Sequence, residues 1–237
     1  MKLIDVKKRV FKANLELVKC GLVTLTWGNV SEIIRDKGLV VIKPSGVSYD
    51  KMKAKDMVVV DLVTGAVIEG KHKPSTDTPT HLELYRKYAD IGSIVHTHSI
   101  NAVAFAQAGL DIPVLGTTHA DYFYGSIPCT RELTEDEVQK DYEINTGRII
   151  IEEIEKRSYS VMSIPGILVK NHGPFVWGEN SFKSVENAKV LEIIAEMGFK
   201  TSLLNKNSIM KQHLLDKHYY RKNGPNAYYG QKHNKNQ

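Results

Sequence analysis

The chain has 237 residues, 42% of them hydrophobic and 25% charged, with a formal net charge of +5. Its apolar runs are too short to cross a bilayer and its two cysteines are too few for a disulfide framework, so we expect a cytoplasmic globular protein without a membrane partner. Basic residues are mixed with acidic ones instead of forming a stripe with exposed aromatic side chains, which argues against nucleic acid and suits a small anionic substrate.

The first third of the chain has the pattern of one helix followed by short strands. Apolar residues recur at helical spacing from Asp5 to Lys19. Short apolar runs bounded by turn residues then predict strands at Val30–Ile34, Leu39–Lys43 and Met57–Asp61. The turn residues at 64–65, between two apolar runs, predict a hairpin and therefore antiparallel pairing.

The rest of the chain alternates between helices and strands. A helix is expected from Thr78, with a capping box formed by Thr80 and Glu83. Further expected elements are a strand at 93–98, helices at 101–108 and from 134 onward, two strands around a turn at 172–173, and helices at 182–199 and 209–221. These elements predict an α/β fold in one domain spanning 1–237, with a mainly antiparallel central sheet covered by helices and a flexible tail at 232–237.

Three histidines stand at the ends of apolar runs. Alternate residues of a strand point to the same face, so His96 and His98 would project side by side, with attachment points about 6.6 Å apart. His172 ends another apolar run just before Gly173-Pro174. Three neutral imidazoles around an open position are typical of catalytic zinc. A hydrogen-bonded pair at 96 and 98, with His172 as an ordinary turn residue, is the alternative.

Small polar turns could bind a phosphate. The hydroxyl groups of Ser75 and Thr76 precede a helix, whose N-terminal N–H groups favour an anion. Similar turns contain Ser45-Gly46 and Gly28-Asn29. Asp77, at the same helix start, fits a capping acid, a fourth contact to the metal or an acid–base group beside the metal.

Several strings of this chain closely resemble the L-ribulose-5-phosphate 4-epimerases of the class II aldolase/epimerase superfamily, from about residue 6 to Gln231. They include "TLTWGNVS", "KPSGVSYDKM", "PSTDTPTH", "IVHTHS", "HADYFYG", "HGPFVWG" and "AYYGQ". The resemblance implies the three-layer α/β/α class II aldolase fold, one Zn²⁺ per subunit and a homotetramer with active sites at its subunit interfaces. Thr76 stands where the family pattern has serine, which keeps the hydroxyl and adds a methyl group.

The same resemblance implies a role for each matched residue. The implied metal ligands are His96, His98 and His172, with Asp77 grouped beside them. The implied sugar-phosphate residues are Gly28, Asn29, Ser45, Gly46, Ser75 and Thr76. Asp121 and Tyr229 match acid–base residues that are contributed across a subunit interface.

The implied reaction interconverts L-ribulose 5-phosphate and D-xylulose 5-phosphate by breaking and re-forming the C3–C4 bond, in arabinose or ascorbate-type catabolism. One alternative is a phosphoketose aldolase of the same superfamily, which would release the two fragments. The other is a non-catalytic scaffold with this fold, which need not keep metal ligands.

Overall fold

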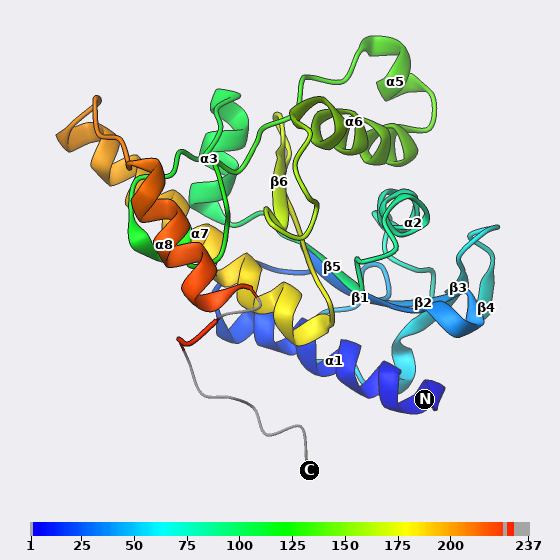
Figure 1. Cartoon of the computed structure of the whole chain (residues 1–237). Coiled ribbons are helices and arrows are strands. Elements are labelled where there is room, and N and C mark those ends of the chain that lie inside the picture. The colour runs from blue at the N-terminus through cyan, green and yellow to red at the C-terminus, as the bar shows by residue number, and fades with distance from the viewer. Residues whose placement is uncertain (1, 225–226, 230–237) are drawn as a thin grey trace.

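The computed structural model describes residues 2–224 and 227–229, and its centre is one seven-stranded sheet (Figure 1). The strand order is β4-β3-β2-β1-β5-β7-β6, and every neighbouring pair is antiparallel. The strands are β1 (Asn29–Ile34), β2 (Leu39–Ile42), β3 (Val58–Asp61), β4 (Val67–Glu69), β5 (Ser93–His96), β6 (Gly166–Val169) and β7 (Gly173–Gly178).

Helices cover both faces of this sheet. They are α1 (Leu3–Lys19), α2 (Thr78–Lys87), α3 (Ile100–Ala108), α4 (Thr117–Ala120), α5 (Glu135–Gln139), α6 (Tyr142–Arg157), α7 (Ser181–Leu204) and α8 (Gln212–Lys222), with short 3₁₀ turns at Arg35–Lys37 and Ala54–Asp56. Helices α1, α3 and α7 cover one face, whereas α2 and α6 cover the other (Figure 1), and each group packs its apolar side chains on its own face. The expected α/β fold with a helix-covered antiparallel sheet is confirmed.

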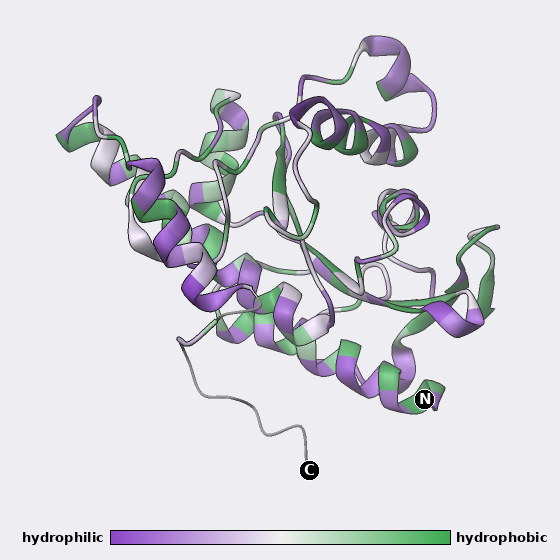
Figure 2. Cartoon of the chain, in the orientation of Figure 1, coloured by the Kyte–Doolittle hydropathy of each residue, from purple (hydrophilic) through white to green (hydrophobic). Residues whose placement is uncertain are grey.

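The strands are apolar on both faces because both faces are covered. In β2, Val40 and Ile42 pack with α2 and α6, while Val41 between them packs with α1. In β7, Phe175 points to the α2–α6 side and Val176 to the opposite side. Figure 2 shows the consequence: the central strands are largely green, whereas α1 alternates between purple and green around its turns.

Most expected elements are present within a few residues of their predicted ends, including the 64–65 hairpin between β3 and β4. The single helix expected from Thr134 is wrong, because α5 ends at Gln139 and Asp141 adopts a left-handed conformation, with φ +55°, before α6 begins. The capping box at Thr80 and Glu83 is also wrong, since the Thr80 hydroxyl donates to a main-chain carbonyl of α6. The tail at 232–237 lies outside the described residues.

Two further expectations concern the cysteines and the membrane. Cys129 is buried and Cys20 is partly buried, and both are free thiols, as expected. Across the described part of the chain, no helix combines the length and the apolar character needed to span a bilayer.

Candidate metal centre and its pocket

The candidate site is built on three adjacent strands. In the β1–β5 ladder Asn29 pairs with His96, and in the β5–β7 ladder His96 pairs with Phe175. These three residues therefore lie in one row across the sheet. Because His172 precedes β7 by one residue, the turn before that strand brings it to the end of β5. The strand register thus gathers residues that are far apart in the sequence.

The three histidines lie within reach of one metal ion. His96, His98 and His172 each offer a ring nitrogen, and these atoms all lie within 4.8 Å of one another. The ring centroids are 4.7 to 5.1 Å apart. Strand β5 ends at His96, so His98 lies just beyond the strand. Gly173 allows the turn that carries His172 to lie against the segment after β5, since a Cβ atom at position 173 would lie 2.8 Å from the Thr97 carbonyl oxygen.

The orientation and charge state of these rings suit a cation. His96 donates from Nδ1 to the Pro174 carbonyl oxygen at 3.0 Å, which leaves its Nε2 free to face His98 Nε2 at 3.1 Å. Burial and the neighbouring His96 lower the pKa of His98, and the same two causes lower the pKa of His172 to about 3. Neutral imidazoles with free nitrogens are the state that binds a divalent metal, so the donor set fits the ion that the sequence predicts.

Asp77 lies at the helix start but does not act as a cap. It precedes α2 and makes no side-chain capping bond; instead its Oδ2 accepts a hydrogen bond from the Asn29 amide at 2.6 Å. Burial acts to raise the pKa of Asp77, but attraction to His96 and His81 and the Asn29 bond outweigh it, so the pKa is lowered. The capping interpretation is therefore wrong for this acid, whereas its proposed contact with a metal stays a prediction, because its carboxylate is not one of the three clustered ligands.

The phosphate-type turns lie side by side at the other end of the site. Main-chain bonds join them: Ser75 donates to the Lys43 carbonyl at 3.0 Å, and Ser45 donates to the Lys73 carbonyl at 2.9 Å. The Lys43 ammonium donates to the Thr26 carbonyl oxygen at 3.0 Å. Burial lowers its pKa to about 8, against attraction to Asp77. This end of the site therefore holds a cation, hydroxyl groups and main-chain amides, which are the groups that bind a phosphate.

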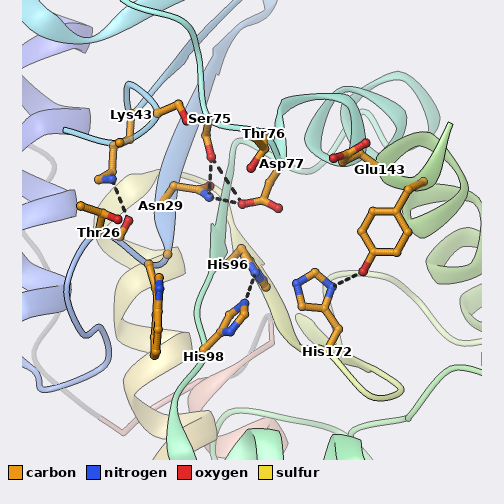
Figure 3. A pocket seen from close by; sticks show the side chains of 15 residues that line it. Thr26, Asn29, Lys43, Ser75, Thr76, Asp77, His96, His98, Glu143 and His172 are labelled. Carbon is orange, nitrogen blue, oxygen red and sulfur yellow. Dashed lines mark hydrogen bonds between the residues drawn. The ribbon is translucent and has the colours of Figure 1, made fainter. Parts of the chain in front are cut away.

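A single pocket of about 330 Å³ joins the two ends (Figure 3). Its lining includes every residue that the sequence proposed as a metal or sugar-phosphate ligand, and five more: Thr26, Trp27, Lys43, Tyr142 and Glu143. Lys43 had a signal, because it stands in the "KPSG" turn. No signal in the sequence pointed to Tyr142 and Glu143, because the sequence predicts one continuous helix from Thr134 and does not mark the break before α6.

Gly28 has a structural role beside its proposed contact with substrate. Its φ is +77°, and a Cβ atom would lie 2.9 Å from the His96 carbonyl oxygen. Only glycine fits this turn without strain, so the turn can pack directly against the histidine strand.

Asp121 and Tyr229 form a separate cluster. The Asp121 carboxylate accepts hydrogen bonds from Arg221 at 3.1 Å and from His218 at 3.0 Å, and the Arg221 guanidinium carbon lies 4.3 Å from the centroid of the Tyr229 ring. Neither residue lines the histidine pocket of its own chain. The structure therefore brings these two residues near each other, while their proposed acid–base roles stay predictions.

These features define an α/β protein with an antiparallel sheet between helical layers and with three clustered histidines beside turns that carry hydroxyl groups and a lysine. The family model described as "Class II Aldolase and Adducin N-terminal domain" matches residues 8–199. The chain belongs to this family.

Solved structures share the fold. An L-fuculose 1-phosphate aldolase has a TM-score of 0.77 and 24% identity, with 92% of this chain and 96% of that chain covered. YgbL of Klebsiella pneumoniae, titled a putative aldolase/epimerase/decarboxylase, has a TM-score of 0.72 and 22% identity, with coverages of 92% and 99%. An L-fuculose-1-phosphate aldolase of Thermus thermophilus has a TM-score of 0.67 and 21% identity, with coverages of 86% and 99%. At these identities the likeness establishes the fold alone.

Proposed function

We propose that this protein is an L-ribulose-5-phosphate 4-epimerase, an isomerase of cytoplasmic pentose catabolism that inverts C4 to give D-xylulose 5-phosphate. The observation that carries this proposal is the shared pocket: three clustered histidines at one end and a lysine with hydroxyl-bearing turns at the other. A ketose phosphate has the matching polarity, with oxygens that bind a metal at one end and a phosphate at the other.

In the proposed mechanism the chain's own residues hold the two ends of the sugar. Lys43, Ser45 and Ser75 would bind the phosphate, so the aldehyde fragment stays in place while the C3–C4 bond is broken. His96, His98 and His172 would hold a divalent ion, which we propose to be Zn²⁺, with Asp77 beside it. Such an ion would supply Lewis-acid stabilisation to the oxygen that becomes negative on cleavage.

The bond cleavage also needs proton transfer at the C4 oxygen. Breaking C3–C4 turns the C4 hydroxyl into an aldehyde and releases its proton, and attack on the other face returns a proton to that oxygen. We assign these transfers to Asp121 and Tyr229 of a neighbouring subunit in a homotetramer. This assignment is supported by two observations. Neither residue lines the histidine pocket of its own chain, and both contact Arg221, Asp121 through a hydrogen bond and Tyr229 through its ring.

A phosphoketose aldolase is the main alternative, and several of the structural neighbours are titled aldolases. Two sequence features favour the epimerase: aldolase relatives tend to carry glutamate where this chain has Asp77, and "HADYFYG" resembles the epimerase branch.

The deciding experiment follows the fate of L-ribulose 5-phosphate with the purified, zinc-loaded protein. We expect D-xylulose 5-phosphate as the main product in a coupled assay, and the reverse conversion from D-xylulose 5-phosphate. Release of glycolaldehyde phosphate and dihydroxyacetone as main products would identify a lyase instead. Absence of stoichiometric metal in protein purified without added zinc, together with no turnover of the zinc-loaded protein, would favour the scaffold.

A further inference from the structure

One side chain of the pocket wall contacts a histidine of the metal group from behind. The Tyr142 hydroxyl lies 3.3 Å from His172 Nδ1 (Figure 3). Figure 3 shows the other ring nitrogen of His172 on the side of His96. Tyr142 is the first residue of α6 and lines the pocket, yet none of the roles assigned above uses it.

The position of the single ring proton of His172 decides which of its nitrogens can bind a cation, and Tyr142 contacts one of the two nitrogens that could carry this proton. A neutral imidazole carries one proton, so Nε2 is a free ligand only when the proton is on Nδ1. For His96 the Pro174 carbonyl oxygen enforces this tautomer, because a carbonyl can only accept. For His172 the corresponding acceptor is the phenol oxygen of Tyr142, which can accept a hydrogen bond from Nδ1–H while keeping its own proton.

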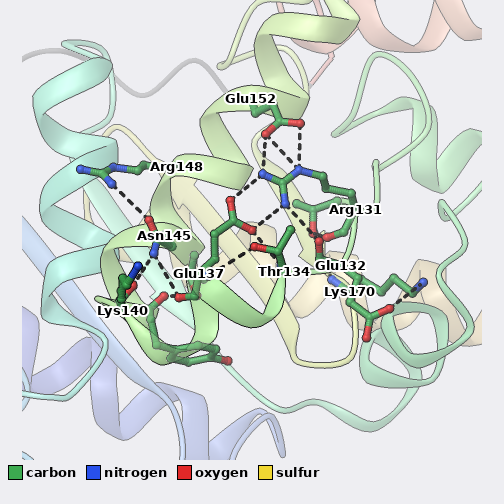
Figure 4. A network of polar contacts seen from close by, with 12 residues as sticks. Arg131, Glu132, Thr134, Glu137, Lys140, Asn145, Arg148, Glu152 and Lys170 are labelled. Carbon is green, nitrogen blue, oxygen red and sulfur yellow. Dashed lines mark hydrogen bonds and ion pairs between the residues drawn. The ribbon is translucent and has the colours of Figure 1, made fainter.

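The α5–α6 corner fixes Tyr142 in this place. Arg131 forms ion pairs with Glu137 of α5 and Glu152 of α6 (Figure 4). The Asn145 amide donates to the carbonyl oxygens of Glu137 and Lys140, which closes the corner around the left-handed residue that precedes α6. A side chain at a helix start that is braced on both sides has little freedom to leave its partner.

We propose that Tyr142 is a positioning residue: its hydroxyl oxygen accepts a hydrogen bond from Nδ1–H of His172 and so holds the ring in the tautomer and orientation that present Nε2 to the metal. This inference rests on the proposed metal site. It differs from the arrangement at His96 in that a side chain, not the main chain, provides the acceptor. A substitution that removes one oxygen atom, Tyr142→Phe, can therefore remove the contact.

The test compares zinc affinity in Tyr142→Phe with that of the wild type, measured by competition with a chromophoric chelator. Loss of a hydrogen-bond partner behind a metal ligand typically costs 10- to 100-fold in affinity, so we expect the zinc Kd to rise by about 10-fold or more. Tyr159→Phe is the matched control: it removes another phenol oxygen, which has no hydrogen-bond partner among the described residues and does not line the pocket, and its Kd should equal that of the wild type.

An unchanged Kd in Tyr142→Phe, or an equal loss in both variants, overturns the proposal. A second measurement needs no variant: long-range ¹H–¹⁵N spectra of the metal-free wild type should show His172 protonated at Nδ1, and finding the proton on Nε2 would reject the assignment. Failure of the wild type to bind stoichiometric zinc would reject the metal site itself, which separates the two hypotheses.

Discussion

The histidine pocket and the Asp121–Arg221–Tyr229 cluster are positioned in different ways. His96 is only 2% exposed and belongs to a central strand, whereas Tyr229 is 54% exposed and follows the last helix. The histidines are held by strand register, while Asp121 is held by side chains of α8. The first region gathers three possible ligands of a cation within one chain, whereas the carboxylate and the phenol of the second do not line the histidine pocket.

This difference has a consequence for how the site would work. Groups that fix a metal need a rigid frame, because the ligand geometry tolerates small errors only. Groups that transfer protons must reach the reacting oxygen, and they can do so from another subunit. The comparison therefore predicts that the two regions complement each other between chains and not within one.

The largest expected effect comes from inactivating each region by a substitution and then combining the two variants in one oligomer. Asp121→Asn should keep zinc binding but lower turnover by about 10²- to 10⁴-fold, because proton transfer is lost. His98→Asn should lose zinc and turnover together. If the regions belong to different subunits, co-expressed variants should recover about a quarter of wild-type turnover by random pairing. The measurement is the coupled D-xylulose 5-phosphate assay on the purified mixed oligomer.

The mixed oligomer has an internal control. Mixing the two pure, preassembled variants without subunit exchange should give no recovery. Mixed oligomers that stay inactive, although each variant folds and assembles, would show that the Asp121 cluster serves no neighbouring pocket.

The sequence predicted the residue types of the first region well, but not their packing. His96 and His98 were recognisable because two histidines end one apolar run, and the phosphate turns because glycine and hydroxyl residues punctuate the chain. The approach of His172 depends on β7 pairing with β5, a long-range contact that no local pattern encodes. Tyr142 was hidden because Asp141 breaks the helix without a glycine or proline to mark the place.

A smaller effect of falling pH should appear in α4, just before Asp121 of the second region. His119 in α4 donates to the Gly125 carbonyl oxygen, and burial lowers its pKa from 6.5 to about 4. As pH falls, His119 therefore takes up a proton at a higher pH in the unfolded chain than in the folded one. The contribution of neutral His119 to stability is complete above about pH 6.5 and is lost as pH falls toward 4. Between pH 7 and pH 5 the wild type should lose about 2 kcal/mol more unfolding free energy than His119→Gln, as measured by urea unfolding. Parallel pH profiles for the two proteins would contradict this.

The smallest effect concerns how the first region is braced. The carboxylate of Glu192 in α7 accepts the main-chain N–H groups of Asn101 and Ala102 at 2.9 and 3.0 Å, and so caps α3 just after the histidine strand. Ser99, the N-cap residue, makes no side-chain capping bond, so Glu192 replaces it.

Glu192→Gln should lower the free energy of unfolding, measured with urea, by about 1 kcal/mol, because a neutral amide has one acceptor atom where the carboxylate has two. Glu196→Gln, which removes only an exposed pair with Lys200, should change stability by less than about 0.5 kcal/mol. Equal effects of the two substitutions would show that the Glu192 carboxylate does not stabilise the start of α3.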